Sequence, residues 1–238
     1  MKKTTLILFL SLYFPLFGQT NLELHKRLML LVDSTKFISD TTGISSFSVI
    51  PNPCEDIVRL DNYNVADLNC DGLKDLIFSG PCRPYNFTYI YINMGTELKL
   101  AFKQAGKVIS IQYDSTSTTI NILREACCCD KFSELLELKI DSKKKLTENS
   151  IHFHSDTRIS IDKSLDRLVF SGIIRTTPIV DDLSRPDECS DEIIEGNKLM
   201  TIKKKAEVIH LAKNGNWRLI LFLENDQQYW LGWIQINE

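Results

Sequence analysis

Four oxygen-bearing side chains recur at short intervals between the apolar runs of the stretch VADLNCDGLKDLIFSG: Asp67, Asn69, Asp71 and Asp75. Alternate side chains of a tight loop can converge on one point, and Gly72 permits the sharp bend that such a loop needs. Calcium prefers hard oxygen ligands, three carboxylates balance its charge, and the carbonyl of Leu73 offers a further oxygen. The pattern therefore predicts a site for Ca²⁺ formed by these four side chains and the Leu73 carbonyl.

The loop has two other possible interpretations. An EF-hand requires a bidentate glutamate at position 12 and two flanking helices, but position 12, counted from Asp67, is Phe78 in an apolar run. The EF-hand is therefore excluded. The second interpretation stays open: an aspartate-rich turn whose side chains accept hydrogen bonds from nearby backbone amides.

The loop resembles the calcium loop of the FG-GAP or VCBS-type repeat of integrin alpha-subunit propellers, which joins two strands with the form D-x-[DN]-x-D-G-x-x-D. The match is carried by nine residues: Val65, Asp67, Asn69, Asp71, Gly72, Asp75, Leu76, Ile77 and Gly80. The stretch TYIYIN, Thr88–Asn93, stands where the next strand of the repeat would lie. A propeller needs several such blades, and one copy is recognisable here, with Cys70 at a place that is often glycine. The resemblance implies a calcium loop more than a propeller.

The C-terminal stretch Thr201–Ile236 resembles the distal half of bacterial SH3-like domains. That family shows a lysine-rich turn, an alternating strand, a Gly-x-Trp and a Gly-Trp-[Ile/Val] ending, which here are Ile202 to Lys204, Val208, Gly215, Trp217, Gly232, Trp233 and Ile234. Departures are Lys205 at a habitual glycine and an acidic excursion from Asp181 to Asn197. The resemblance implies a small barrel over residues 166–238 that binds cell-wall peptide or glycan, or an envelope protein.

Aromatic residues of this segment have two possible roles. Trp217 and Trp233 can pack the core of a small barrel, or one of them can line a groove in which a ligand stacks. Tyr229 and Trp233 are the residues we expect to bind the ligand if the groove is real.

The elements that would position these residues are mostly β. Leu24, Leu28 and Leu31 recur at helical spacing and predict one amphipathic helix. Residues 109–113 and 136–140 alternate between apolar and polar side chains, as do 88–93 and 118–123, which is typical of half-buried antiparallel strands. We expect a mainly β protein: a helix plus antiparallel sheet domain over 20–160, followed by the SH3-like barrel.

The first 19 residues read as a secretory signal peptide, because two lysines precede an apolar run too short to span a bilayer. We therefore expect a periplasmic or extracellular protein that does not stay inserted in the membrane. Loss of Lys2 and Lys3 changes the formal charge from −3 to −5, which argues against a nucleic-acid partner.

Seven cysteines in an exported chain predict some disulfide pairing. Cys54 and Cys82, which flank the acidic loop in sequence, are the expected pair. Cys189, in the acidic excursion, is the expected free thiol.

No catalytic motif supports an enzyme. Glu188–Asp191, ECSD, is similar to the nucleophile motif of cell-wall peptidases but lacks a suitable downstream histidine, and His152 and His154 share a strand face without a visible third metal ligand. We expect a non-catalytic envelope binding protein with no catalytic residues. The rivals are an envelope hydrolase or hydrolase inhibitor, and a purely structural protein in which calcium only holds a loop.

Overall fold

The computed structural model describes residues 24, 26–32, 39–54, 59–83, 85–126, 131–155, 157, 159–162, 165–186, 193–225 and 227–236. The predicted signal peptide, Cys127 to Cys129 and Cys189 lie outside these ranges. Within them, no helix is long and apolar enough to cross a membrane.

The protein is mainly β, as predicted, and the α-helix found among the described residues contains Leu24 and residues 26–32. Two short 3₁₀ helices follow, η1 (Ile44–Ser46) and η2 (Leu60–Asn62). The strands of the described chain are β1 (Tyr63–Ala66), β2 (Asp75–Cys82), β3 (Tyr85–Asn93), β4 (Leu98–Ala105), β5 (Lys107–Tyr113), β6 (Ser117–Arg124), β7 (Phe132–Asp141), β8 (Leu146–His154), β9 (Asp166–Arg175), β10 (Ser184–Pro186), β11 (Ile193–Glu195), β12 (Lys198–Asn214), β13 (Trp217–Asn225) and β14 (Gln228–Gln235).

Strands β1 to β4 form an antiparallel sheet in chain order, and the acidic loop joins its first two strands. The chain then turns at Gly106, whose φ of 129° favours glycine, and enters the second sheet as β5. A Cβ atom at Gly106 would also lie 2.8 Å from Ile122 Cγ2. The turn therefore brings the two sheets together face to face.

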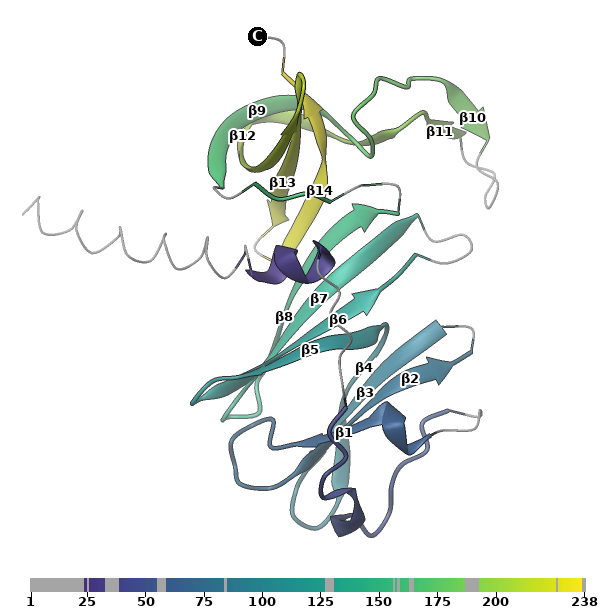
Figure 1. The fold of residues 1–238 in the computed structure, drawn as a ribbon, viewed down its shortest axis with the longest axis vertical. Coiled ribbons are helices and arrows are strands. Elements are labelled where there is room, and N and C mark those ends of the chain that lie inside the picture. Colours follow the sequence, from purple (N-terminus) through teal and green to yellow (C-terminus); the bar gives the residue numbers. More distant parts are fainter. Residues whose placement is uncertain are drawn as a thin grey trace, which may run out of the picture.

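The second sheet has the strand order β13-β12-β9-β14-β8-β7-β6-β5. Strands β13 and β14 also pair with each other, which closes β9, β12, β13 and β14 into a small barrel. One pairing departs from the expected antiparallel pattern, because β14 runs parallel to β8. Through it the barrel continues directly into the meander β5–β8 (Figure 1).

The apolar core has several layers. The inner face of the first sheet packs on β5–β7 to form a sandwich, with Ile77, Ile90, Ile120 and Leu138 at most 1% exposed. A separate cluster, which includes Ile174, Ile220 and Ile234, contains apolar residues of the barrel strands. Both faces of β13 are therefore buried, since Ile220 belongs to this cluster whereas Leu219 and Leu221 belong to another.

The N-terminal helix packs at the junction of the barrel and the meander (Figure 1). Leu24 and Leu28 are buried in one cluster with Leu135 and Ile151 of the meander and Leu231 of the barrel. The predicted apolar face of the helix is thus confirmed, and it covers the point where the parallel pair is formed.

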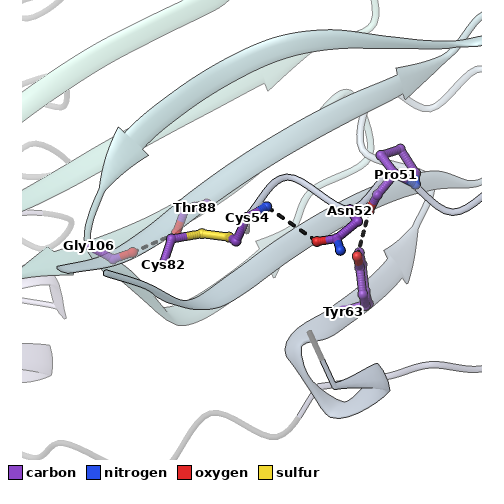
Figure 2. Close-up of a disulfide and its surroundings, with 7 residues drawn as sticks. All are labelled: Pro51, Asn52, Cys54, Tyr63, Cys82, Thr88 and Gly106. Carbon is purple, nitrogen blue, oxygen red and sulfur yellow. Dashed lines mark hydrogen bonds between the residues drawn. A yellow bond between two sulfur atoms is a disulfide. The ribbon is translucent and has the colours of Figure 1, made fainter. Parts of the chain in front are cut away.

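The predicted disulfide is present between Cys54 and Cys82, with the Cα atoms 5.3 Å apart (Figure 2). It fastens the segment 44–54 over the outer face of the first sheet, where Phe47 and Ile50 pack. The Tyr63 hydroxyl donates to the Pro51 carbonyl at 2.6 Å and holds the same segment. A disulfide is consistent with an exported protein.

The acidic excursion forms the ribbon β10–β11, which projects from the barrel (Figure 1). Its base is held by two buried side chains. Arg175 donates to the Asp181 carbonyl and to Asn197 Oδ1 at 3.0 and 2.9 Å, and Asn197 donates to Thr177 and to the Ile179 carbonyl. The described part of the excursion is therefore an anchored element of the barrel.

Candidate functional site

The acidic loop is organised by hydrogen bonds from its own backbone. Asp67 accepts from the amides of Asp71 and Gly72 at 3.1 and 2.9 Å, and Asn69 Oδ1 accepts from the Asp71 amide at 3.0 Å. Asp71 Oδ1 accepts from the Leu73 amide at 2.9 Å. These contacts are the capping arrangement that was the alternative to a calcium site.

Asp75, like Asn69 of the same set, is buried, with 0% of its surface exposed. It begins β2, and its two oxygens accept from the amides of Leu68 and Asn93, each at 2.8 Å. Burial raises the pKa of Asp75 to about 6, against the opposing effect of these two hydrogen bonds, and the negative charges of Asp71 and Asp67 raise it further.

Lys144, from the turn between β7 and β8, places its Nζ 3.1 Å from Asp71 Oδ2. The Lys144 ammonium is therefore already paired with one carboxylate oxygen of Asp71. The hard oxygens of the set fit a cation such as calcium, which would compete with Lys144 for Asp71. In the described ranges, no three His, Cys, Asp or Glu side chains are arranged to hold a metal ion. That statement concerns His, Cys, Asp and Glu side chains alone, so it does not consider Asn69 or the Leu73 carbonyl.

The residues expected to bind ligand lie on β14, but they face the core. Trp233 is 4% exposed and belongs to the cluster under the helix, so its ring has no free face for a ligand. Tyr229 is partly buried and packs on the same cluster, as does Trp217. Of the two alternatives open for Trp233, the structure shows the core position.

The neighbouring Trp230 points to the opposite face of β14, because successive side chains of a strand alternate. Its ring stacks on His152, with centroids 5.0 Å apart, and meets the edge of Phe132 at 5.2 Å. The ring of His154 also contacts Phe132 at 6.1 Å. All four rings are partly exposed. We call Phe132, His152, His154 and Trp230 the aromatic cluster.

Charged groups surround the aromatic cluster. Trp230 Nε1 donates to Glu224 Oε2 at 2.6 Å. A row of side chains runs across four strands from Arg124 through Glu134 and His152 to Trp230, each residue opposite the next. Burial lowers the pKa of His152, while Glu134 and Glu224 raise it and Arg124 lowers it. The cluster is therefore an aromatic surface with acidic residues beside it.

A hydrolase triad combines a serine, a histidine and an acid, as do Ser150, His152 and Glu134. The geometry of these three residues differs from that of a catalytic triad. Ser150 Oγ lies 2.9 Å from His152 Nε2, and Glu134 Oε1 lies 3.9 Å from the same Nε2 atom. A catalytic histidine uses one nitrogen for the nucleophile and the other for the acid that orients it. Ser150 is also only 7% exposed. This trio lacks the arrangement of a general base.

Sequence reasoning singled out His152 and His154 as a pair on one strand face but did not connect them with Trp230. The signal available was weak, because β8 and β14 are separated by more than seventy residues. Only their parallel pairing places the three rings together.

No protein-family model, no curated protein and no solved structure matches the chain.

Proposed function

We propose that the protein is a non-catalytic binding protein. More specifically, it is an exported protein of the cell envelope that recognises a cell-wall peptide, a cell-wall glycan or an envelope protein. The observation that carries the proposal is the aromatic cluster at the junction of the barrel and the meander. Exposed rings bind sugars and peptides by stacking at low entropic cost, and adjacent charges select among ligands.

The closed barrel and the SH3-like pattern of residues 201–236 support this proposal. The ligand surface is moved by three residues along β14 from the position that the sequence indicated, from Trp233 to Trp230. Glu134 and Glu224 favour a ligand that carries a positive group, such as the free ammonium of a cell-wall peptide.

We further propose that the loop 67–75 binds Ca²⁺ through Asp67, Asn69, Asp71, Asp75 and the Leu73 carbonyl. The resemblance to the FG-GAP or VCBS loop and the hard-oxygen donor set support this assignment. When bound, calcium would supply positive charge to three neighbouring carboxylates and stabilise the first hairpin of the sheet. Its part is structural support of the binding protein.

The binding proposal is tested with the chain from residue 20, the predicted mature protein, mixed with purified sacculi. The protein should sediment with the sacculi and leave them uncleared in a zymogram. Trp230→Ala should remain in the supernatant, while Trp230→Phe, which keeps an aromatic face, and Leu223→Ala, an exposed apolar control on β13, should sediment.

Clearing of the sacculi would show that the protein is a hydrolase and would contradict the proposal. Failure to bind sacculi, soluble cell-wall peptide or any envelope protein would leave the structural role, in which calcium only holds a loop.

A further inference from the structure

A second site lies at one end of the sandwich, and it shares no residue with the acidic loop 67–75 or with the aromatic cluster. It is a cavity of about 270 Å³ between η2, the start of β1, the end of β2, and the beginnings of β3 and β5. The inner faces of these strands are apolar elsewhere, but polar side chains point into the cavity here. They include Asn62, Asn64, Ser79, Asn86 and Lys107.

Folding explains only part of this polarity. Asn64 is 5% exposed and its Oδ1 accepts from the Asp40 amide at 2.7 Å, and Ser79 Oγ accepts from the Val108 amide at 2.8 Å. These two residues hold the walls together. By contrast, within the described residues the side-chain amides of Asn62 and Asn86 have no hydrogen-bond partner and border the cavity. Their donors and acceptors are available to a ligand.

The walls are held in place by close contacts. Thr88 Oγ1 donates to the Gly106 carbonyl at 3.0 Å (Figure 2). The Gly106 amide donates to the Asn86 carbonyl at 2.7 Å, and the two bonds tie β3 to the start of β5. Asn62 lies directly over Gly80, where an added Cβ would approach Asn62 Nδ2 to 2.4 Å. Only glycine at position 80 leaves the Asn62 amide in this position.

The chemistry of the cavity indicates the ligand. A primary amide both donates and accepts, as does a sugar hydroxyl, so two free amides beside the Ser79 hydroxyl suit a polyhydroxylated molecule. Asp61 also lines the cavity, and its negative charge is balanced by Arg59, whose Nη2 lies 3.1 Å from Asp61 Oδ2. Lys107 adds one positive charge. Its Nζ lies 3.4 Å from Glu125 Oε2, and both side chains are well exposed, at 45% and 65%. Such a pair is weak, and the carboxylate of a ligand can replace Glu125.

We propose that this cavity binds one sugar residue that carries a carboxylate, with Asn62, Asn86 and Ser79 bound to its hydroxyls and Lys107 bound to its carboxylate. The volume suits a single sugar residue, since it lies just below the range of about 300–1,000 Å³ that is usual for small-molecule pockets. This site is independent of the proposed function, because it shares no residue with the aromatic cluster.

The test is titration of the isotope-labelled chain from residue 20 with glucuronate and, separately, with glucose, followed by amide chemical shifts. Titration reaches about 10 mM sugar, which is tenfold above a dissociation constant of about 1 mM. Glucuronate should produce saturable shifts centred on Ser79, Asn86 and Lys107. Glucose, which lacks the carboxylate, should bind at least about tenfold more weakly, as expected for loss of one charge-assisted hydrogen bond.

Variants distinguish the two parts of the site. Lys107→Gln should weaken glucuronate about tenfold and leave glucose unchanged, whereas Asn86→Ala should weaken both sugars. Gly80→Ala displaces the Asn62 amide and should also weaken both. The matched control is Lys139→Gln, an exposed lysine on the outer face of β7, which should bind as the unmodified chain does.

The proposal is overturned if glucuronate gives no saturable shifts, if the shifts lie outside the cavity, or if Lys107→Gln binds glucuronate unchanged. Chemical shifts far from position 107 show whether each variant is folded. Asn86→Ala removes an exposed side chain, so it provides a folded variant even if Gly80→Ala does not fold.

Discussion

Trp230 and His152 face each other across the parallel pair β14–β8, with ring centroids 5.0 Å apart and ring planes inclined by 30°. This contact lies where the barrel and the meander share a continuous sheet. Trp233, three residues along the same strand, faces the opposite side and is buried under the N-terminal helix. The two tryptophans should therefore respond differently to substitution.

Trp230→Ala should cost little stability, because the ring is partly exposed, while ligand binding is lost. Trp233→Ala should lower the free energy of unfolding by about 3–5 kcal/mol, since it empties a packed site. Urea titration followed by circular dichroism measures both. Similar losses of stability for the two variants would show that Trp230 is also a core residue.

Calcium should stabilise the native protein, with a dissociation constant of about 0.1–1 mM, the weak extracellular range. At 10 mM calcium and a 1 mM constant, mass action adds about 1.4 kcal/mol. Asp71→Ala should abolish the effect. Lys144→Met should strengthen calcium binding, because the ammonium that contacts Asp71 Oδ2 is removed. Calorimetry without saturable heat at millimolar calcium, together with melting unchanged by chelator, would contradict the site.

Reduction of the Cys54–Cys82 disulfide should lower stability by about 3–4 kcal/mol on the chain-entropy model, because the bond closes a loop with a sequence separation of 28. The double variant Cys54→Ser, Cys82→Ser should show the same loss without reductant. Mass mapping of the non-reduced protein checks the pairing directly, and free thiols at both positions would disprove it. Cys70, exposed and unpaired, should react with thiol reagents in the native state.

The stability of the protein should depend on the protonation of Asp75. Its pKa is about 6 in the folded state against 3.8 ordinarily, so the native protein holds this proton more tightly than the unfolded chain does. The contribution of Asp75 is therefore fully present below about pH 4, falls as pH rises, and is lost above about pH 6.

The size of this effect is up to about 3 kcal/mol, at 1.36 kcal/mol per pKa unit. Asp75→Asn does not titrate and is the comparison. The difference in unfolding free energy between the two proteins should change between about pH 4 and 6, in the direction just given. A difference that is constant over this range would refute the assignment.

Asn197→Ala should loosen the β10–β11 ribbon, because Asn197 joins Arg175 to the carbonyls and hydroxyl at the base of the excursion. Leaving the buried Arg175 with an unsatisfied donor should cost about 1–3 kcal/mol. Limited proteolysis should then cleave the ribbon faster. Glu195→Gln, which removes only a surface partner of Lys198, serves as the control and should change stability by less than about 1 kcal/mol.

Much of the local structure could be predicted from the sequence. The alternation in residues 109–113 and 136–140 identified β5 and β7, the spacing of Leu24, Leu28 and Leu31 identified the helix, and Cys54 and Cys82 were correctly paired. These features follow from the 3.6-residue and two-residue periods of side chains, and from cysteines placed on both sides of one loop. The calcium and SH3-like assignments remain predictions.

Tertiary structure alone decided which face of β14 is buried. The alternation of Tyr229, Trp230 and Trp233 shows that neighbouring residues face opposite sides, but the identity of the covered side depends on the helix and on β8, which are distant in sequence. Two further features depend on such distant contacts. One is the parallel pairing that creates the aromatic cluster, and the other is the packing of β5 against the first sheet, which encloses the polar cavity. Local periodicity carries no information about them, because it records how a strand alternates and leaves open which strand lies beside it.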